Sequence, residues 1–205
     1  MRTVADDRTA RAAIRDEALR LFAEHGPDAV TIRQIASAAS VSPALVMHHY
    51  GSKTGLREAV DEHVGRIFDD LINEIAAGGL GSGTLAASFT EQLLRRLPPG
   101  SPVPGYLRRL LLAGDRMSVE LFRRWHLLSL QLFTALVERG AARPSPDPAV
   151  RAAFLLANDL ALLLLRDQVT AALAVDPLSP EGLARWAQEV ISVYADGVFT
   201  HQEES

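Results

Sequence analysis

One stretch decides the fold of this chain: T-I-R-Q-I-A-S-A-A-S-V-S-P-A-L-V-M-H-H-Y, residues 31–50. Thr31 and Gln34 have the three-residue spacing of a capping box, which marks the start of a short helix. Ser42 and Pro43 mark a second start, because serine caps well and proline costs nothing at the first helical position. Two short helices that meet at a sharp corner are therefore predicted, as in a helix-turn-helix.

The corner between the two helices makes its own demands on the sequence. A small residue is needed where the helices approach most closely, and Ala36 fits that place. Four positions later the turn favours a positive φ, so Ser40 stands there at a cost of roughly 1 kcal/mol relative to glycine. Apolar side chains with suitable spacing can hold both helices against a preceding one at about 9–24: Ile32, Ile35, Val41, Leu45 and Val46.

The rest of the chain is also patterned as helices, without β-branched runs, so we predict an all-α fold. An N-terminal three-helix helix-turn-helix domain is expected at 1–53, and a C-terminal all-helical domain at 54–205. Ser52 is expected to cap a helix that ends near residue 77. Further helical segments are predicted at about 84–97, 103–113, 115–139, 147–173 and 179–199.

Composition narrows the class of protein. Of the 205 residues 48% are hydrophobic, enough for a substantial core, and the net charge is −4. Residues 1–53 carry seven Lys or Arg against six Asp or Glu, and the remainder carries fourteen against nineteen. There is no cysteine, the N-terminus has no apolar signal core, and the oily run at 152–165 is too short for a bilayer. A cytoplasmic protein with no membrane partner is expected.

The N-terminal quarter resembles the TetR family of transcriptional regulators. The resemblance rests on T-I-R-Q-I-A (31–36), A-S-V-S (39–42) and H-H-Y-G-S-K-T-G-L (48–56), and covers about residues 9–60. The chain departs from the family pattern at three positions, with Ser40 and Ala44 in place of glycine and Met47 in place of tyrosine. The remainder matches only in length and helicity. The resemblance implies that the helix-turn-helix domain at 1–53 binds DNA and that the helical domain at 54–205 serves for ligand binding and dimerisation.

This resemblance implies a set of DNA contacts. Ser42 to Leu45 would enter the major groove, and the hydroxyls and helix starts at Thr31 and Ser42 would face phosphates. Arg33 would reach the backbone or a base, and Lys53 would clamp a phosphate. The implied DNA-binding residues are Thr31, Arg33, Ser42, Pro43, Ala44, Leu45, Met47, His48, His49 and Lys53. Met47 either meets a thymine methyl or packs under the turn, and Tyr50 is expected to close the core of the N-terminal domain.

The adjacent histidines raise the question of a metal or catalytic site. His48 and His49 point about 100° apart on a helix and have no acidic residue or cysteine within one turn, which argues against a shared metal. Contact with the sugar-phosphate backbone is the reading that the family implies, and surface or packing roles are the alternative. No metal and no cofactor are expected.

The two C-terminal helical segments are expected to form a dimer interface. By resemblance they pair with a second copy, which reading a palindrome requires, although ordinary core packing is the alternative. The predicted interface residues are Phe154, Asp159, Leu162, Arg166, Trp186, Val190 and Tyr194. Asp159 and Arg166 are seven residues apart on one face, so a structural pair, within the protomer or across the dimer, is expected of them, with ligand recognition as the alternative.

A cavity between the middle helices would suit a small apolar or amphipathic effector. Its candidate lining is Phe89, Tyr106, Met117, Phe122, Trp125 and Asn158, for each of which plain core packing is the alternative. The leading hypothesis is thus a ligand-responsive repressor that binds a palindromic operator as a homodimer. The alternatives are a nonspecific nucleic-acid or protein-interaction module and an α-helical enzyme, for which no catalytic motif is present.

Overall fold

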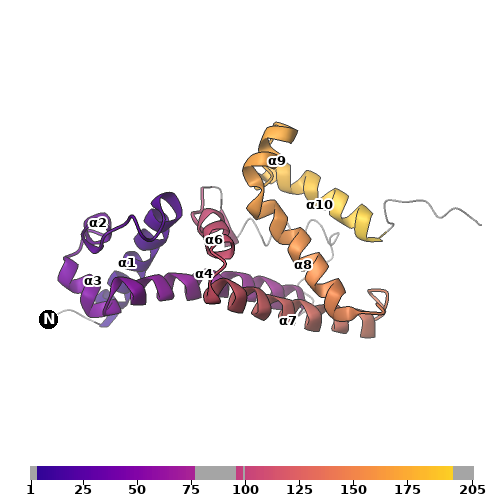
Figure 1. The fold of residues 1–205 in the computed structure, drawn as a ribbon, viewed down its shortest axis with the longest axis horizontal. Helices are drawn as coiled ribbons and strands as arrows, with labels where there is room; N and C mark the ends of the chain where they lie inside the picture. The colour runs from indigo at the N-terminus through magenta and orange to yellow at the C-terminus, as the bar shows by residue number, and fades with distance from the viewer. Residues whose placement is uncertain (1–3, 77–95, 99, 196–205) are drawn as a thin grey trace, which may run out of the picture. The chain divides into compact units, whose positions relative to one another are not determined.

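The computed structural model describes residues 4–76, 96–98 and 100–195, which form helices joined by turns and loops and contain no strand (Figure 1). The all-α prediction is confirmed. The predicted segment at 84–97 lies almost wholly outside the described residues, as do residues 196–199. The helices are α1 (Val4–His25), α2 (Ile32–Ala38), α3 (Pro43–Tyr50), α4 (Lys53–Ala76), α6 (Val103–Leu112), α7 (Arg116–Glu138), α8 (Pro148–Leu164), α9 (Arg166–Leu173) and α10 (Pro180–Ala195).

The chain divides into two compact units. Residues 1–69 and 100–125 form the first, and the remainder forms the second. The first unit therefore joins α1, α2 and α3 with most of α4 and with α6. Compactness is a different criterion from function, so the division into a DNA-binding domain at 1–53 and a helical domain at 54–205 stays a prediction.

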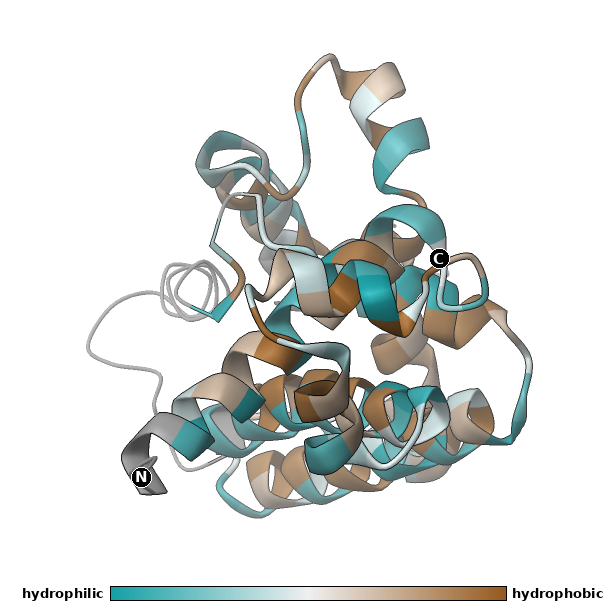
Figure 2. Cartoon of the chain, turned by 90° about the vertical axis from the view of Figure 1, so that its left-hand side faces the viewer, coloured by the Kyte–Doolittle hydropathy of each residue, from teal (hydrophilic) through white to brown (hydrophobic). Residues whose placement is uncertain are grey.

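The N-terminal helices α1, α2 and α3 surround a small apolar core. Along each helix the hydropathy alternates, as the brown and teal segments in Figure 2 show. The apolar positions face inward, because α1 packs against both α2 and α3. The core side chains are at most 1% exposed: Ile14, Ala18, Phe22, Val30, Ile35, Ala36 and Val46.

The corner between α2 and α3 has the predicted geometry. Ser40 adopts a left-handed conformation with φ of 55°. The amide of Ser40 donates to the Ser37 carbonyl (3.1 Å) and the amide of Val41 donates to the Ala36 carbonyl (2.9 Å). This pair of bonds is a Schellman motif, which satisfies the last carbonyls of α2 and redirects the chain. The helix-turn-helix predicted from residues 31–50 is confirmed.

Side chains from α6 fasten the N-terminal helices to the rest of the first unit. Arg109 donates from Nε to the Ala23 carbonyl (3.0 Å) and from Nη2 to the Glu24 carbonyl (3.1 Å), near the C-terminal end of α1. The hydroxyl of Tyr106 donates to Asp61 Oδ1 on α4 (2.5 Å), and both side chains are buried. Burial raises the pKa of Asp61, while this hydrogen bond and the Arg57 guanidinium oppose the shift. α6 is thus tied to both α1 and α4.

One predicted helix is wrong. The segment expected at 147–173 is broken at Leu165 into α8 and α9, which are bent by 72°. Up to Leu164 the helix is held by buried leucines, whereas no residue of α9 is buried. The apolar run that predicted continuity ends at Leu165, and Arg166 then pairs in bidentate fashion with Asp176 (2.9 and 2.5 Å), closing the loop before α10.

None of the helices in the described part of the chain has by itself the length and apolar character of a membrane span. Among the described helices, only α8 and α9 taken together, a pair bent by 72°, are long and apolar enough to match a membrane span.

Ser40→Gly tests the geometry of the corner. Glycine removes a strain of roughly 1 kcal/mol at positive φ, partly offset by the larger entropy of the unfolded chain. The free energy of unfolding should therefore rise slightly in denaturant melts, and DNA binding should be unchanged. The control Ser37→Gly lies inside α2, where glycine should lower that free energy by about 0.5–1 kcal/mol. A marked loss of stability in Ser40→Gly would show that the corner is assigned incorrectly.

Candidate nucleic-acid interface

The outer face of α3 is the surface that the helix-turn-helix presents to solvent. Val46 is completely buried and holds the helix down. Ala44, Met47 and His48, spaced by three and four residues, lie on the opposite side and are exposed. Ser42 caps the helix, its Oγ accepting from the Leu45 amide (3.2 Å). A short, firmly capped helix therefore carries an accessible tip, as a recognition helix requires.

Two residues of α2 and its cap border this face. Thr31 and Gln34 form the predicted capping box: the Thr31 hydroxyl donates to Gln34 Oε1 (2.8 Å), and the Thr31 amide donates to the same oxygen (2.8 Å). Thr31 is therefore engaged in fixing the start of α2. Arg33 is exposed, which leaves its guanidinium accessible to a ligand.

Lys53, the only lysine of the chain, begins α4. Its Nζ donates to the Asp28 carbonyl (3.1 Å), which holds the α1–α2 connection against the start of α4. An ammonium group has three donors, so one bond to a carbonyl leaves others for a phosphate oxygen. Next to it, the Ser52 hydroxyl accepts from the Gly55 amide (2.9 Å), consistent with the predicted cap.

The two histidines of α3 have different environments. His48 is exposed, whereas the side chain of His49 is only 5% exposed and its Nε2 lies 3.5 Å from Asp7 Oδ1 on α1. The expectation that His49 contacts DNA is therefore corrected: it packs α3 onto α1, because it shares the inner side of the helix with Val46 and Tyr50. The Tyr50 hydroxyl donates to the Arg11 carbonyl (2.6 Å), as expected for a residue that closes the core.

The predicted effector-pocket residues have different environments in the described structure. Tyr106 and Trp125 are core side chains, and the Trp125 indole donates to Asp69 (3.1 Å). Met117 is 42% exposed, Phe122 is half-buried, and Phe89 lies outside the described residues. Asn158 belongs to the second unit, where it donates to the Tyr194 hydroxyl (2.9 Å). The lining of an effector site stays a prediction.

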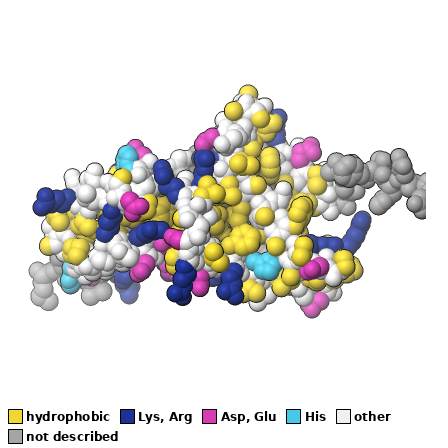
Figure 3. Space-filling view, viewed as in Figure 1, with side chains coloured by type: hydrophobic (Ala, Val, Ile, Leu, Met, Phe, Trp, Pro, Cys, Tyr) yellow, Lys and Arg dark blue, Asp and Glu magenta, His cyan; other side chains and the backbone are white. Residues whose placement is uncertain are grey.

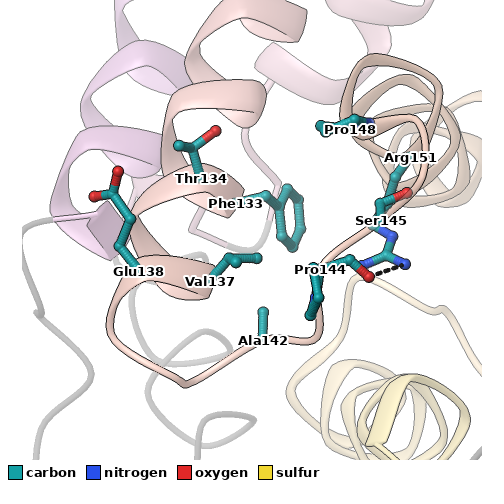
Figure 4. A pocket seen from close by; sticks show the side chains of 9 residues that line it. All are labelled: Phe133, Thr134, Val137, Glu138, Ala142, Pro144, Ser145, Pro148 and Arg151. Atoms are coloured by element: carbon teal, nitrogen blue, oxygen red, sulfur yellow. Dashed lines mark hydrogen bonds between the residues drawn. The ribbon is translucent and has the colours of Figure 1, made fainter.

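A shallow pocket does occur in the second unit (Figure 4). Phe133 and Val137 of α7 face Pro144 and Pro148 across it, and Arg151 lies at its edge with its guanidinium bonded to the Arg143 and Pro144 carbonyls. Its volume of about 170 Å³ is below the roughly 300 Å³ at which small-molecule sites begin. In this conformation the pocket is too small for a drug-sized effector.

Most of the predicted dimer residues keep some exposed surface in the protomer. Phe154, Asp159 and Tyr194 are exposed, and Trp186 and Val190 are half-buried. Leu162 is 6% exposed, so it is corrected to a core residue of the protomer.

Within the protomer, Asp159 and Arg166 do not pair with each other, and a pair across the dimer stays a prediction. Arg166 binds Asp176, whereas Asp159 accepts a long hydrogen bond from the Tyr194 hydroxyl (3.4 Å). The break at Leu165 separates the two side chains that a continuous helix would have placed on one face.

The fold and the exposed α3 tip define a helix-turn-helix DNA-binding protein. Residues 14–60 match the family described as "Bacterial regulatory proteins, tetR family", and residues 100–200 match "Tetracyclin repressor-like, C-terminal domain". The chain belongs to the TetR family of transcriptional regulators. Members of this family bind DNA and small-molecule effectors, typically as dimers, and are not enzymes.

Two relatives with similar sequences are HTH-type transcriptional regulators, which is consistent with this membership. The chain is 33% identical to the HTH-type transcriptional repressor KstR2 of Rhodococcus jostii, covering 79% of this chain and 83% of the relative. It is 35% identical to the HTH-type transcriptional regulatory protein RaaS of Mycobacterium tuberculosis, over 73% and 67%. Among solved structures, the fatty acid degradation regulator FadR from Bacillus halodurans superposes with a TM-score of 0.70 at 15% identity, covering 93% and 97%, and so shares the fold.

The adjacent histidines offer a matched pair of substitutions. His49→Ala opens a cavity between α3 and α1, and should lower the free energy of unfolding by about 1–3 kcal/mol. His48→Ala removes an exposed ring and should change it by less than about 0.5 kcal/mol. Denaturant melts of both variants measure this difference, and equal losses would contradict the burial of His49.

Proposed function

We propose that this protein is a ligand-responsive repressor that acts in the cytoplasm and binds a palindromic operator as a homodimer. The observation that carries the proposal is the exposed, capped tip of α3 within a TetR-family helix-turn-helix. Neighbouring residues would position this tip on the DNA. Arg33 and Lys53 would contact phosphates, and the start of α3 at Ser42 would lie beside the groove.

A single N-terminal domain makes too few contacts for tight specific binding, so two copies are needed. Exposed apolar side chains supply a surface for the second copy. Hydrophobic side chains gather over α8 and α9 in Figure 3. Among the exposed apolar residues of α8 and of the break that follows it are Phe154 (65%), Val150 (63%) and Leu165 (50%). Val150, Phe154 and Ala157 follow the spacing of one helical face, so α8 would bury a continuous stripe against its symmetry mate.

The response to an effector would pass through α6 and α4. α6 is bonded to α1 through Arg109 and to α4 through Tyr106 and Asp61. A displacement of either helix therefore changes how the N-terminal helices are held. In a dimer such a change alters the separation of the two α3 tips, and a misfit of a few ångströms breaks simultaneous contact with both half-sites. A small apolar or amphipathic effector is proposed on the composition of the middle helices.

Selection from a pool of random duplexes tests the proposal. The full-length protein should enrich a palindrome whose half-sites are about one helical turn apart, roughly 34–36 Å. The competing function is nonspecific binding of nucleic acid. Residues 1–53 carry slightly more basic than acidic residues, unlike the rest of the chain, and basic groups attract the phosphates of any duplex. Equal affinity for all duplexes would favour that alternative and refute the operator-binding proposal.

Lys53→Ala should weaken binding to every duplex by a similar factor. The lysine contacts a phosphate in this proposal, so its loss should lower the slope of log K against log salt concentration by about one ion per protomer. Fluorescence titrations at several salt concentrations measure the slope. The substitution Arg185→Ala, far along the chain on α10, is the control for overall charge and should leave the slope unchanged. An unchanged slope in Lys53→Ala would refute the phosphate contact.

Phe154→Asp should block dimerisation. A carboxylate in the centre of the α8 stripe would be buried without a partner, so a monomer is expected by sedimentation at micromolar concentration. Affinity for the selected palindrome should fall by orders of magnitude, because the second half-site no longer binds in the same complex. Leu127→Asp is the matched control, since Leu127 on α7 is 57% exposed. A dimeric Phe154→Asp variant would place the interface elsewhere.

A further inference from the structure

The recognition helix has an unusual chemistry for reading bases. Its eight residues, P-A-L-V-M-H-H-Y, include no arginine, lysine, asparagine, glutamine or carboxylate. The side chains that form bidentate pairs with guanine or adenine are arginine, lysine, asparagine and glutamine. α3 therefore cannot supply the commonest base-specific hydrogen bonds.

The outward face of α3 is mainly apolar. Ala44 and Met47 lie on this face with His48, and Met47 is 44% exposed although it is a large hydrophobic residue. Two other polar side chains of α3 and its cap are already committed, since Ser42 Oγ caps the helix and the buried His49 faces α1. Only His48 on this face offers a nitrogen to an incoming ligand.

We propose that Ala44 and Met47 read the 5-methyl groups of thymines in the major groove, so that each operator half-site carries thymines opposite these two residues. The thymine methyl is the one apolar group that a base edge presents in that groove. Methionine suits the contact, because its flexible and polarisable side chain adapts to the position of the methyl. His48 then hydrogen-bonds to a neighbouring base edge or phosphate. This inference rests on the proposed binding of operator DNA.

Duplexes that lack single methyl groups test the inference. The palindrome selected from the random pool is resynthesised with deoxyuridine in place of each half-site thymidine in turn, which deletes the methyl and keeps the base pairing. Affinity of the full-length protein should fall roughly fourfold for each contacted methyl, because burying one methyl group against an apolar side chain contributes about that factor to binding. Deoxyuridine outside the half-sites is the control and should have no effect. Restoring the methyl as 5-methyldeoxycytidine, paired with guanine, should recover part of the affinity relative to deoxycytidine.

A variant assigns the contact to one side chain. Met47→Ala should bind the thymidine duplex more weakly and should no longer distinguish it from the deoxyuridine duplex at the matching position. Met117→Ala is the matched control, because Met117 is also exposed (42%) but lies on α7; it should retain the full discrimination.

The outcomes separate this inference from the proposed function. If selection enriches no sequence, operator binding itself fails. If a sequence is enriched but deoxyuridine substitution leaves affinity unchanged, thymine-methyl reading is overturned while operator binding stands. If the wild type and Met47→Ala lose affinity equally on deoxyuridine substitution, the assignment to Met47 is overturned.

Discussion

The structure of the N-terminal domain depends on one backbone conformation, the left-handed Ser40 at the corner between α2 and α3. Because this residue turns the chain, the Val41 amide can bond back to Ala36, and Ser42 is placed where it caps the next helix. A non-glycine residue at positive φ is tolerated because the packed core around Ala36 and Val46 fixes both helices. Without that corner, residues 31–50 would form no exposed helix tip, and no surface of the domain would fit a groove.

Anchoring on one side of α3 is what frees the other side. Val46, His49 and Tyr50 face α1, and the Tyr50 hydroxyl bonds to the Arg11 carbonyl. The outward residues then need no partner within the protein and remain available to a ligand. The same logic extends to α6, where Arg109 and Tyr106 bind α1 and α4. The helix that presents the proposed DNA-binding surface and the helices that hold it are thus connected by a few identifiable polar contacts.

Local signals in the sequence predicted most of the N-terminal domain. The Thr31–Gln34 spacing, the Ser42-Pro43 start and the position of Ser40 each have a short-range physical meaning, and all three features are confirmed. The errors concern long-range packing. The burial of His49 depends on α1, and the partner of Arg166 is Asp176, across a break that the leucine-rich run concealed. Periodicity identifies the faces of a helix but does not say which partner covers each of them. The partners of the interface and effector residues therefore could not be predicted from periodicity alone.

The central claim is that the outward tip of α3 faces duplex DNA. The chain contains no cysteine, so Ala44→Cys creates a single thiol at that tip. The rate of its alkylation by a small maleimide can be measured with and without the selected duplex. Strong protection is expected at position 44, reversed by high salt, and none for the control Ala172→Cys on the exposed side of α9. Equal alkylation rates at position 44 with and without DNA, under conditions where the complex is formed, would contradict it.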